Sequence, residues 1–281
     1  MTLHAIATPH PERYRSMTLF LRRLLALLQR HVYLLTGSWP RLIEMLYWPT
    51  INMMVWGFTS LYVLRVLNHA IAVSGIFVAG VILTEVFFRS TVGMMLMFLE
   101  EVWSRNLGHL FASPLKFSDY LIGIMGLSLL RTMISISLAV VVANYLFDFS
   151  LFSLGRPLLG FLALLLLSGW WYGFLMIALL LRFGLAAEWT AWMLVWLIIP
   201  IIAPYYPVSV LPQWMQFVSW ALPQTYVFEC VKDLIGQHQL RTDYLIKALA
   251  LNVVYFVACA FIFYRAYQGA RRRGGLLQMG E

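Results

Sequence analysis

The sequence predicts an all-α polytopic membrane protein, and three observations support this fold class. Of the 281 residues, 62% are hydrophobic and 11% are charged, whereas soluble domains carry about 45–50% apolar and roughly 25% charged residues. Six apolar stretches have the length of about 20 residues that a membrane-spanning helix needs. Lysine and arginine gather in alternate connections between these stretches, which is typical of multi-pass membrane proteins.

The six predicted transmembrane helices define the organisation of the chain. They cover residues 44–64, 70–99, 120–147, 157–181, 188–206 and 244–267. We therefore divide the chain into an N-terminal part (1–40), a six-span transmembrane domain (41–268) and a basic tail (269–281). No cleavable signal peptide is expected, because the first forty residues lack a short apolar core followed by a small-residue cleavage site.

The positive charges predict the orientation of the spans. Thirteen lysine and arginine residues lie on one side of the predicted spans and four on the other. The positive-inside rule assigns the richer side to the cytoplasm, and both termini fall on that side. The net charge of +8 is therefore a topology signal that also attracts anionic membrane lipids, and nucleic acid is not expected as a partner.

Residues 13–36 are predicted to form an amphipathic helix that lies in the membrane interface. On a helical wheel the apolar side chains gather on one face and the arginines on the other, which suits an interfacial helix with its charges at the headgroups. These arginines are Arg15, Arg22, Arg23 and Arg30. Either a simple membrane anchor or a specific functional role is consistent with this pattern.

Residues 207–229 are apolar but broken by prolines. The apolar part, 208–222, is too short to cross the bilayer, so we expect two short re-entrant helices on the outer side before the last span. Backbone that enters a membrane without crossing it must be covered by protein or line a cavity. The marker residues are Pro212, Pro223, Tyr226 and Glu229. A plain interfacial loop is the alternative.

Three charged residues fall inside predicted spans. Glu85 and Arg89 are four residues apart, so they share one helix face and can pair, and Arg131 lies in the third span. A charge at the bilayer centre costs roughly 2.5–3.5 kcal/mol on insertion scales, so such residues usually face protein or water. They line a polar pathway, form a structural ion pair between helices, or extend a side chain toward the lipid headgroups.

The fifth predicted span carries an aromatic face. Trp189, Trp192 and Trp196 follow one another at i, i+3 and i+7. Such a face can stack on sugar rings or hold apolar ligands, and tryptophan also collects at membrane interfaces. Trp192 and Trp196, which lie deeper in the span, are the candidate substrate-lining residues.

The segment 100–116 between the second and third spans is predicted to be a short amphipathic helix on the cytoplasmic side. Glu100 and Glu101 suit the start of such a helix, because carboxylates are favoured by the N-terminal dipole. Apolar residues follow at near-helical spacing, and Pro114 ends the helix. The residues concerned are Glu100, Glu101, Trp103, Arg105, Leu107, Phe111 and Pro114. The segment either transmits a push from a partner or simply lies on the headgroups.

Motifs for catalysis and nucleotide binding are absent from the sequence. It contains no GxxxxGK[ST] phosphate loop, no HExxH, no GxSxG and no GxGxxG after a strand. The two cysteines, Cys230 and Cys259, form no metal-binding pattern, and a disulfide between them is not expected. We therefore expect no catalytic residues, no metal site and no cofactor bound by this chain.

The order of these features resembles the permeases of the ABC type-2 exporter class. A Leu-x-x-Ser-Pro-Leu signature follows the coupling helix of that class, and here it reads Leu-Phe-Ala-Ser-Pro-Leu at 110–115. The outer segment reads Pro-Val-Ser-Val-Leu-Pro at 207–212 and Leu-Pro-Gln-Thr-Tyr at 222–226. Where the class often has Glu-Arg-x-x-Gly-Thr, residues 101–106 read Glu-Val-Trp-Ser-Arg-Asn, so the partner contact is expected to differ.

The resemblance implies a transmembrane permease subunit of an ATP-driven exporter in a bacterial inner (plasma) membrane. Two copies of the permease, alike or different, would surround the pathway, and two copies of a separate ATPase subunit would bind ATP and Mg²⁺. The substrate would be amphipathic: a glycan, glycolipid, lipid or drug. The rival interpretations are a membrane-embedded lipid or sugar transferase, which would need an acidic or histidine cluster, and a non-transporting scaffold or channel.

Overall fold

The computed structural model describes residues 25, 29, 30, 33, 37, 39–67, 72–106 and 117–272. The described residues are almost entirely helical and include no β-strand. The α-helices are α2 (Trp39–Leu67), α3 (Ala72–Trp103), α5 (Phe117–Phe147), α6 (Pro157–Phe183), α7 (Glu188–Ile201), α8 (Gln213–Trp220), α9 (Pro223–Gln237) and α10 (Thr242–Arg272). Short 3₁₀ turns cover Leu151–Leu154, Leu185–Ala187 and Val208–Val210.

Four of these helices are long and apolar enough to cross a membrane. They contain Gly75–Trp103, Ser118–Phe147, Pro157–Phe183 and Thr242–Arg272, and they make the chain compatible with a multi-pass membrane protein. The remaining two predicted spans fall on α2 and α7. α2 has 29 residues but is not among these four helices. α7 has 14 residues, or about 21 Å, against a hydrocarbon core of about 30 Å.

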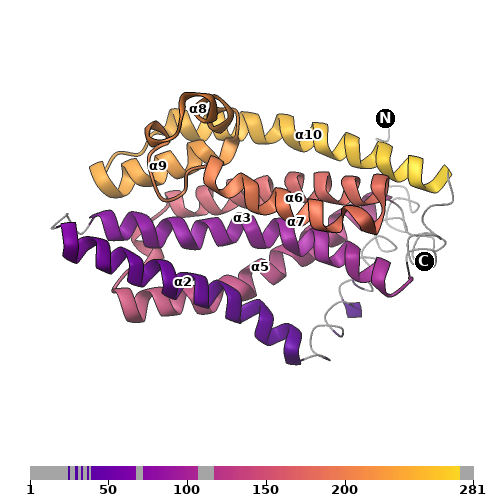
Figure 1. Cartoon of the computed structure of the whole chain (residues 1–281), viewed down its shortest axis with the longest axis horizontal. Coiled ribbons are helices and arrows are strands. Elements are labelled where there is room, and N and C mark those ends of the chain that lie inside the picture. The colour runs from indigo at the N-terminus through magenta and orange to yellow at the C-terminus, as the bar shows by residue number, and fades with distance from the viewer. Residues whose placement is uncertain are drawn as a thin grey trace, which may run out of the picture.

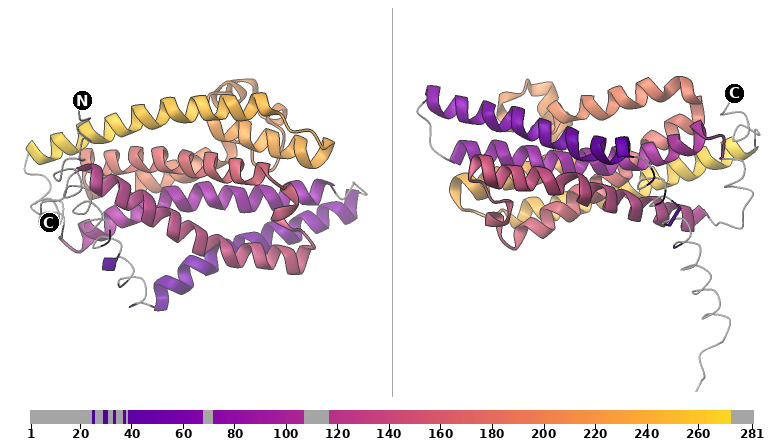
Figure 2. Two further views of the ribbon diagram at one scale, coloured as in Figure 1. Left: turned by 180° about the vertical axis from the view of Figure 1, so that it is seen from behind. Right: turned by 90° about the horizontal axis from the view of Figure 1, so that it is seen from below.

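The long helices run alternately up and down a single bundle (Figures 1 and 2). α3, α6 and α10 end, and α2, α5 and α7 begin, at the end that we call the basic end; α8 and α9 lie at the opposite end (Figure 1). α3 packs against α2, α5, α6, α7 and α9. In its apolar window 83% of the residues are buried, against 17% for α10. α3 is therefore the central helix, and α10 presents most of its surface outward.

Two glycines bring α6 close to α3. Gly169 and Gly173 are spaced four residues apart and both face α3, where a Cβ at Gly169 would lie 2.9 Å from the Phe87 carbonyl oxygen and one at Gly173 would lie 3.0 Å from Met94 Cβ. The close approach lets the Thr91 hydroxyl donate to the Gly169 carbonyl at 3.2 Å. This is the small-residue packing that joins helices in membranes.

A buried polar cluster joins α6 to α10. Asn252 of α10 is fully buried, and its Oδ1 accepts hydrogen bonds from Ser168 Oγ at 2.8 Å and from Trp171 Nε1 at 2.9 Å. Its Nδ2 donates to the Leu164 carbonyl at 3.3 Å. Every polar atom of the amide is thus paired, which is the condition for burying it in an apolar bundle.

Two helices, α8 and α9, lie in the segment where the sequence predicts two short re-entrant helices before the last span. Pro212 precedes α8 and Pro223 occupies the first turn of α9, where the missing proline N–H costs nothing. α9 continues to Gln237, well beyond the predicted end at Glu229. It packs against α10 and α3.

Candidate functional site

A cavity of about 360 Å³ lies between α2, α3 and α7. It brings together two pairs of residues that the sequence singled out independently, Glu85 with Arg89 and Trp192 with Trp196. The other lining residues are Glu44, Trp48, Ile51, Asn52, Val55, Phe88, Val92 and Leu96. The cavity therefore has a polar wall on α3 and an aromatic wall on α7, and α2 adds both polar and apolar side chains, including Glu44 and Trp48.

The polar wall is centred on Glu85, near the middle of α3. Its Oε2 accepts a hydrogen bond from Arg89 Nε at 2.9 Å, one helical turn further on. Its Oε1 accepts a hydrogen bond from Asn52 Nδ2 of α2 at 2.7 Å. The Glu85 side chain is 7% exposed. A carboxylate at such a depth is stable because both oxygens are paired and its charge is balanced.

Only one nitrogen of the Arg89 guanidinium takes part in this pair. Its Nε faces Glu85, whereas its two terminal nitrogens make no hydrogen bond to any residue within the described part of the chain. Its side chain is 15% exposed and lines the cavity. Because guanidinium nitrogens are strong donors in a fixed fork, they offer a polar anchor for a molecule in the cavity.

The aromatic wall comes from α7. Trp196 lies against Phe88 of α3, with ring centroids 4.8 Å apart, and Trp192 lines the same cavity one turn earlier. Both tryptophans also border an open groove on the outside of α7, which includes Trp189. The predicted aromatic face thus divides between the cavity and the outer surface, with Trp189 on the outer surface.

Arg131 lies apart from this cavity. Its Nη2 reaches Glu100 of α3 at 3.1 Å across the α3–α5 contact, and both side chains are largely buried. Arg131 does not line the cavity at Glu85. Among the interpretations offered for it, the ion pair between helices matches this geometry.

Glu100 and Glu101 were predicted to begin a new helix, but this prediction is wrong. Both residues lie near the end of α3. The helix continues to Trp103 because Leu99 and Val102 remain buried on its core face. Arg105 then adopts a left-handed conformation (φ 54°), and Asn106 N donates to the Glu101 carbonyl at 2.9 Å. This is a helix C-cap of the Schellman type, in which Arg105 occupies the position that glycine usually holds.

The two carboxylates near the C-terminus of α3 face an unfavourable dipole, and cations offset it. Glu101, whose side chain is 3% exposed, pairs with Arg30 at 2.8 Å. Asn106 Nδ2 donates to its Oε2 at 2.8 Å. Trp103 and Arg105 are exposed. The remaining predicted residues of these two segments lie outside the described residues: Arg15, Arg22, Arg23, Leu107, Phe111 and Pro114.

At the opposite end, Glu229 and Lys232 hold the segment before α8 against α9. Lys232 Nζ donates to the carbonyls of Ala203 and Tyr206 at 3.0 and 2.6 Å and to Glu229 Oε1 at 2.7 Å. The same Oε1 accepts from Val208 N at 2.9 Å. Burial lowers the pKa of Lys232, and Glu229 partly opposes that effect.

The other marker residues of this end have packing roles. The Tyr226 ring lies 5.1 Å from Trp220 and 5.6 Å from Tyr244, so it joins α8, α9 and the start of α10. Pro212 is exposed and Pro223 buried. Neither offers a group that binds a ligand.

The sequence contained signals that the interpretation missed. Asn52 and Asn252 are polar residues inside apolar stretches, and both are hydrogen-bonded across helices. Gly169 and Gly173 form a GxxxG pattern within an apolar helix, which is a known signal for close helix packing. Lys232 gave no comparable signal, because its carbonyl partners are set by tertiary structure.

Within the described residues, no group of three or more histidine, cysteine, aspartate and glutamate side chains is placed to hold a metal ion. Cys230 and Cys259 are both buried and free. The chain matches no protein-family model, and the comparison with curated proteins gives no match. The cavity at Glu85 and the carboxylates at the end of α3 are therefore the observations on which a function has to be built.

Proposed function

We propose that the chain is the permease subunit of an ATP-driven exporter of the ABC type-2 class, which moves an amphipathic substrate out of the cytoplasm or the inner leaflet. The observation that carries this proposal is the cavity at Glu85. It combines the ion pair of Glu85 and Arg89, hydrogen-bond donors of Arg89 that this pair does not use, and a tryptophan wall. It lies near the middle of the long apolar helix α3.

An amphipathic substrate fits both walls of this cavity. A phosphate, carboxylate or hydroxyl group would accept from the terminal nitrogens of Arg89. Its apolar or sugar-ring part would lie on Trp192 and Trp196, since aromatic faces combine large contact area with low entropy cost. Glycans, glycolipids, lipids and drugs can all combine a polar group with an apolar or ring-shaped part, so the proposed substrate class includes all four.

The proposal includes six crossings and an outer end closed by α8 and α9. α2 and the shorter α7 would complete the six, with α7 and the following residues spanning together. The Lys232 cluster supports a closed outer end, because it holds the backbone at 203–208 against α9. Both termini would be cytoplasmic in a bacterial inner membrane, as the distribution of basic residues favours.

Movement would reach the cavity through α3. This helix is continuous from Glu85 to Trp103, so a displacement of its end at Glu101 moves the polar wall of the cavity as well. A separate ATPase subunit, present in two copies beneath a pair of permeases, would bind ATP and Mg²⁺. By binding one conformation of the permease more tightly, it would shift the equilibrium between permease conformations. Segment 100–116 would be the contact.

The test begins with co-purification. A tagged chain, expressed with its own operon, should retain an ATPase subunit, and candidate amphiphiles should raise ATP turnover in reconstituted vesicles. Trp196→Ala should weaken this stimulation, whereas Trp214→Ala, which changes another exposed tryptophan on α8, should leave it unchanged. Chemical conversion of a lipid or sugar by the chain alone would favour the transferase interpretation. Absence of any ATPase partner would favour the scaffold or channel.

A further inference from the structure

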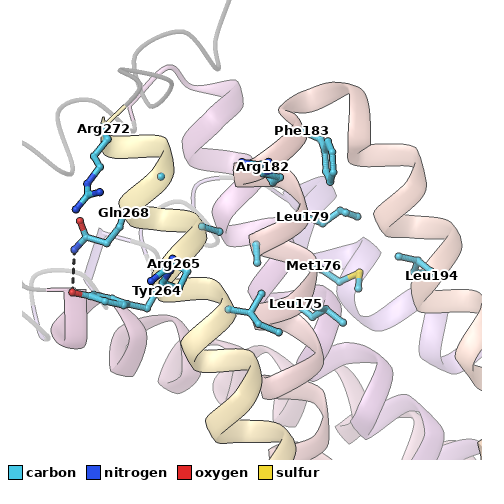
Figure 3. A pocket seen from close by; sticks show the side chains of 14 residues that line it. Leu175, Met176, Leu179, Arg182, Phe183, Leu194, Tyr264, Arg265, Gln268 and Arg272 are labelled. Atoms are coloured by element: carbon cyan, nitrogen blue, oxygen red, sulfur yellow. Dashed lines mark hydrogen bonds between the residues drawn. The ribbon is translucent and has the colours of Figure 1, made fainter.

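A second and larger cavity, of about 840 Å³, lies between α6, α7 and α10 at the basic end of the bundle (Figure 3). Small residues on facing helices leave it hollow: Ala178 on α6, and Ala266 and Gly269 on α10. It shares no lining residue with the cavity at Glu85. Its size is that of a binding site for a small molecule, which is roughly 300–1,000 Å³.

One part of this cavity is strongly basic. Arg182 lies in the last turn of α6, and Arg265 and Arg272 lie on one face of α10 at i and i+7. The lining includes no aspartate or glutamate. None of the three guanidinium groups forms an ion pair with a residue that the structure describes. The unbalanced positive potential attracts an anion, and guanidinium forks match phosphate oxygens.

The rest of the cavity is apolar. Below Arg182 in Figure 3, α6 presents Leu179 and, one turn further down, Met176 and Leu175, and α7 adds Leu194. Ile262 extends the same surface along α10. Charge at one end and hydrocarbon surface at the other are the two halves of a phospholipid.

The basic part lies where headgroups would be if α6 crosses a membrane. α6 has 27 residues, or about 40 Å, which exceeds a hydrocarbon core of about 30 Å. Arg182, in the last turn, therefore lies at headgroup level, and the leucines below it lie in the hydrocarbon.

We propose that this cavity binds an anionic phospholipid of the adjacent leaflet. Arg182, Arg265 and Arg272 attract its negatively charged headgroup, and an acyl chain lies along Leu175, Leu179 and Ile262. Three arginines in a lining that includes no aspartate or glutamate among the described residues discriminate against zwitterionic lipids, whose own cation would meet the same positive potential. The proposal depends on the chain spanning a membrane and not on its being an exporter.

The experiment measures lipid binding to the full-length chain purified in detergent. Phosphatidylglycerol or phosphatidylcholine is added in mixed micelles, and retained lipid is counted by native mass spectrometry. Phosphatidylglycerol should be retained in preference, and affinity should fall about fivefold for each arginine removed in Arg182→Gln, Arg265→Gln and Arg272→Gln. Arg156→Gln is the matched control, because Arg156 is an exposed arginine at the other end of α6.

A second variant tests the cavity without changing charge. Ala266→Leu fills the hollow and should also displace phosphatidylglycerol, while Arg265→Lys should retain part of the binding because it keeps the charge but loses the fork. Equal retention of both lipids, equal binding by the triple glutamine variant, or displacement by soluble glycerol phosphate at similar concentration would each overturn the proposal. The last result would assign the arginines to a free anion.

Discussion

The guanidinium of Arg30 and the carboxylate of Glu101 meet along two parallel contacts, Nη1 to Oε1 at 2.8 Å and Nη2 to Oε2 at 2.9 Å. These residues are 71 positions apart in the chain. The pair joins the N-terminal segment that the sequence assigns to the membrane interface with the end of the central helix α3. A two-pronged pair of this kind fixes orientation as well as distance.

The burial of this pair is unequal, so its two halves should respond differently to mutation. Glu101 is 3% exposed and Arg30 39%. We expect Arg30→Ala to destabilise the protein by roughly 1.5–3 kcal/mol, because the buried carboxylate of Glu101 loses two charge-assisted hydrogen bonds. Glu101→Gln should cost less, since Arg30 can turn to solvent. Thermal unfolding in one detergent measures both, and a larger loss in Glu101→Gln would contradict the assignment.

Arg105 combines a strained backbone with an exposed charge. Two substitutions distinguish the effect of the backbone conformation from the effect of the side chain. Arg105→Gly keeps the left-handed conformation at no steric cost, whereas Arg105→Val places a β-branched residue where it is strongly disfavoured. Arg105→Val should be the less stable by about 1–2 kcal/mol. If Arg105 also contacts the ATPase, both variants should lose transport-linked ATP turnover. Full turnover in Arg105→Gly would remove the side chain from that contact.

The ion pair at Glu85 should be a requirement for assembly of the bundle. Arg89→Ala leaves the buried carboxylate with Asn52 as its hydrogen-bond donor but without a cation, at a cost of about 3–5 kcal/mol. Adding Glu85→Gln to Arg89→Ala should recover much of that loss, because no charge then remains. Yield and melting temperature in detergent report the effect. Normal stability of Arg89→Ala alone would show that water reaches Glu85.

The α3–α6 contact predicts opposite signs for two alanine substitutions on α6. Gly169→Ala places its Cβ on the Ser90 side chain and the Phe87 carbonyl, and such overpacking costs about 1–3 kcal/mol. Gly160→Ala meets nothing within 4 Å, so it should gain about 0.5–1 kcal/mol from helix propensity. The two melting temperatures should move apart. Equal shifts would mean that α6 does not approach α3 as described.

Lys232 makes the stability of the outer end depend on pH. Burial lowers its pKa in the folded protein, so the unfolded chain binds more protons between that lowered value and the ordinary pKa of about 10.4. The free energy of unfolding should therefore rise with pH across this interval. Melting temperatures from pH 7 upward, compared with those of Lys232→Met, measure the contribution of Lys232 to this pH dependence. A wild-type melting temperature that falls with rising pH, relative to that of Lys232→Met, would contradict this prediction.

The positions of the long helices were largely predictable from local signals. α6 was expected at 157–181 and covers Pro157–Phe183, because a proline begins it and Gly184, with a φ of 74°, ends it. Pro212 and Pro223 likewise separated α8 from α9. The pairing of Glu85 with Arg89 was predictable too, since a spacing of four residues fixes them on one face.

Interactions between helices were decided by tertiary structure alone. The charged residues Arg131 and Glu100 were known from the sequence, but their pairing depends on the depth and rotation of α5 against α3, which no local spacing records. Glu101 shows the same limit: its carboxylate suited a helix start, yet α3 runs past it because its core face remains apolar to Val102. The sequence by itself determined which segments are apolar helices; packing determined which charges meet and where the cavities lie.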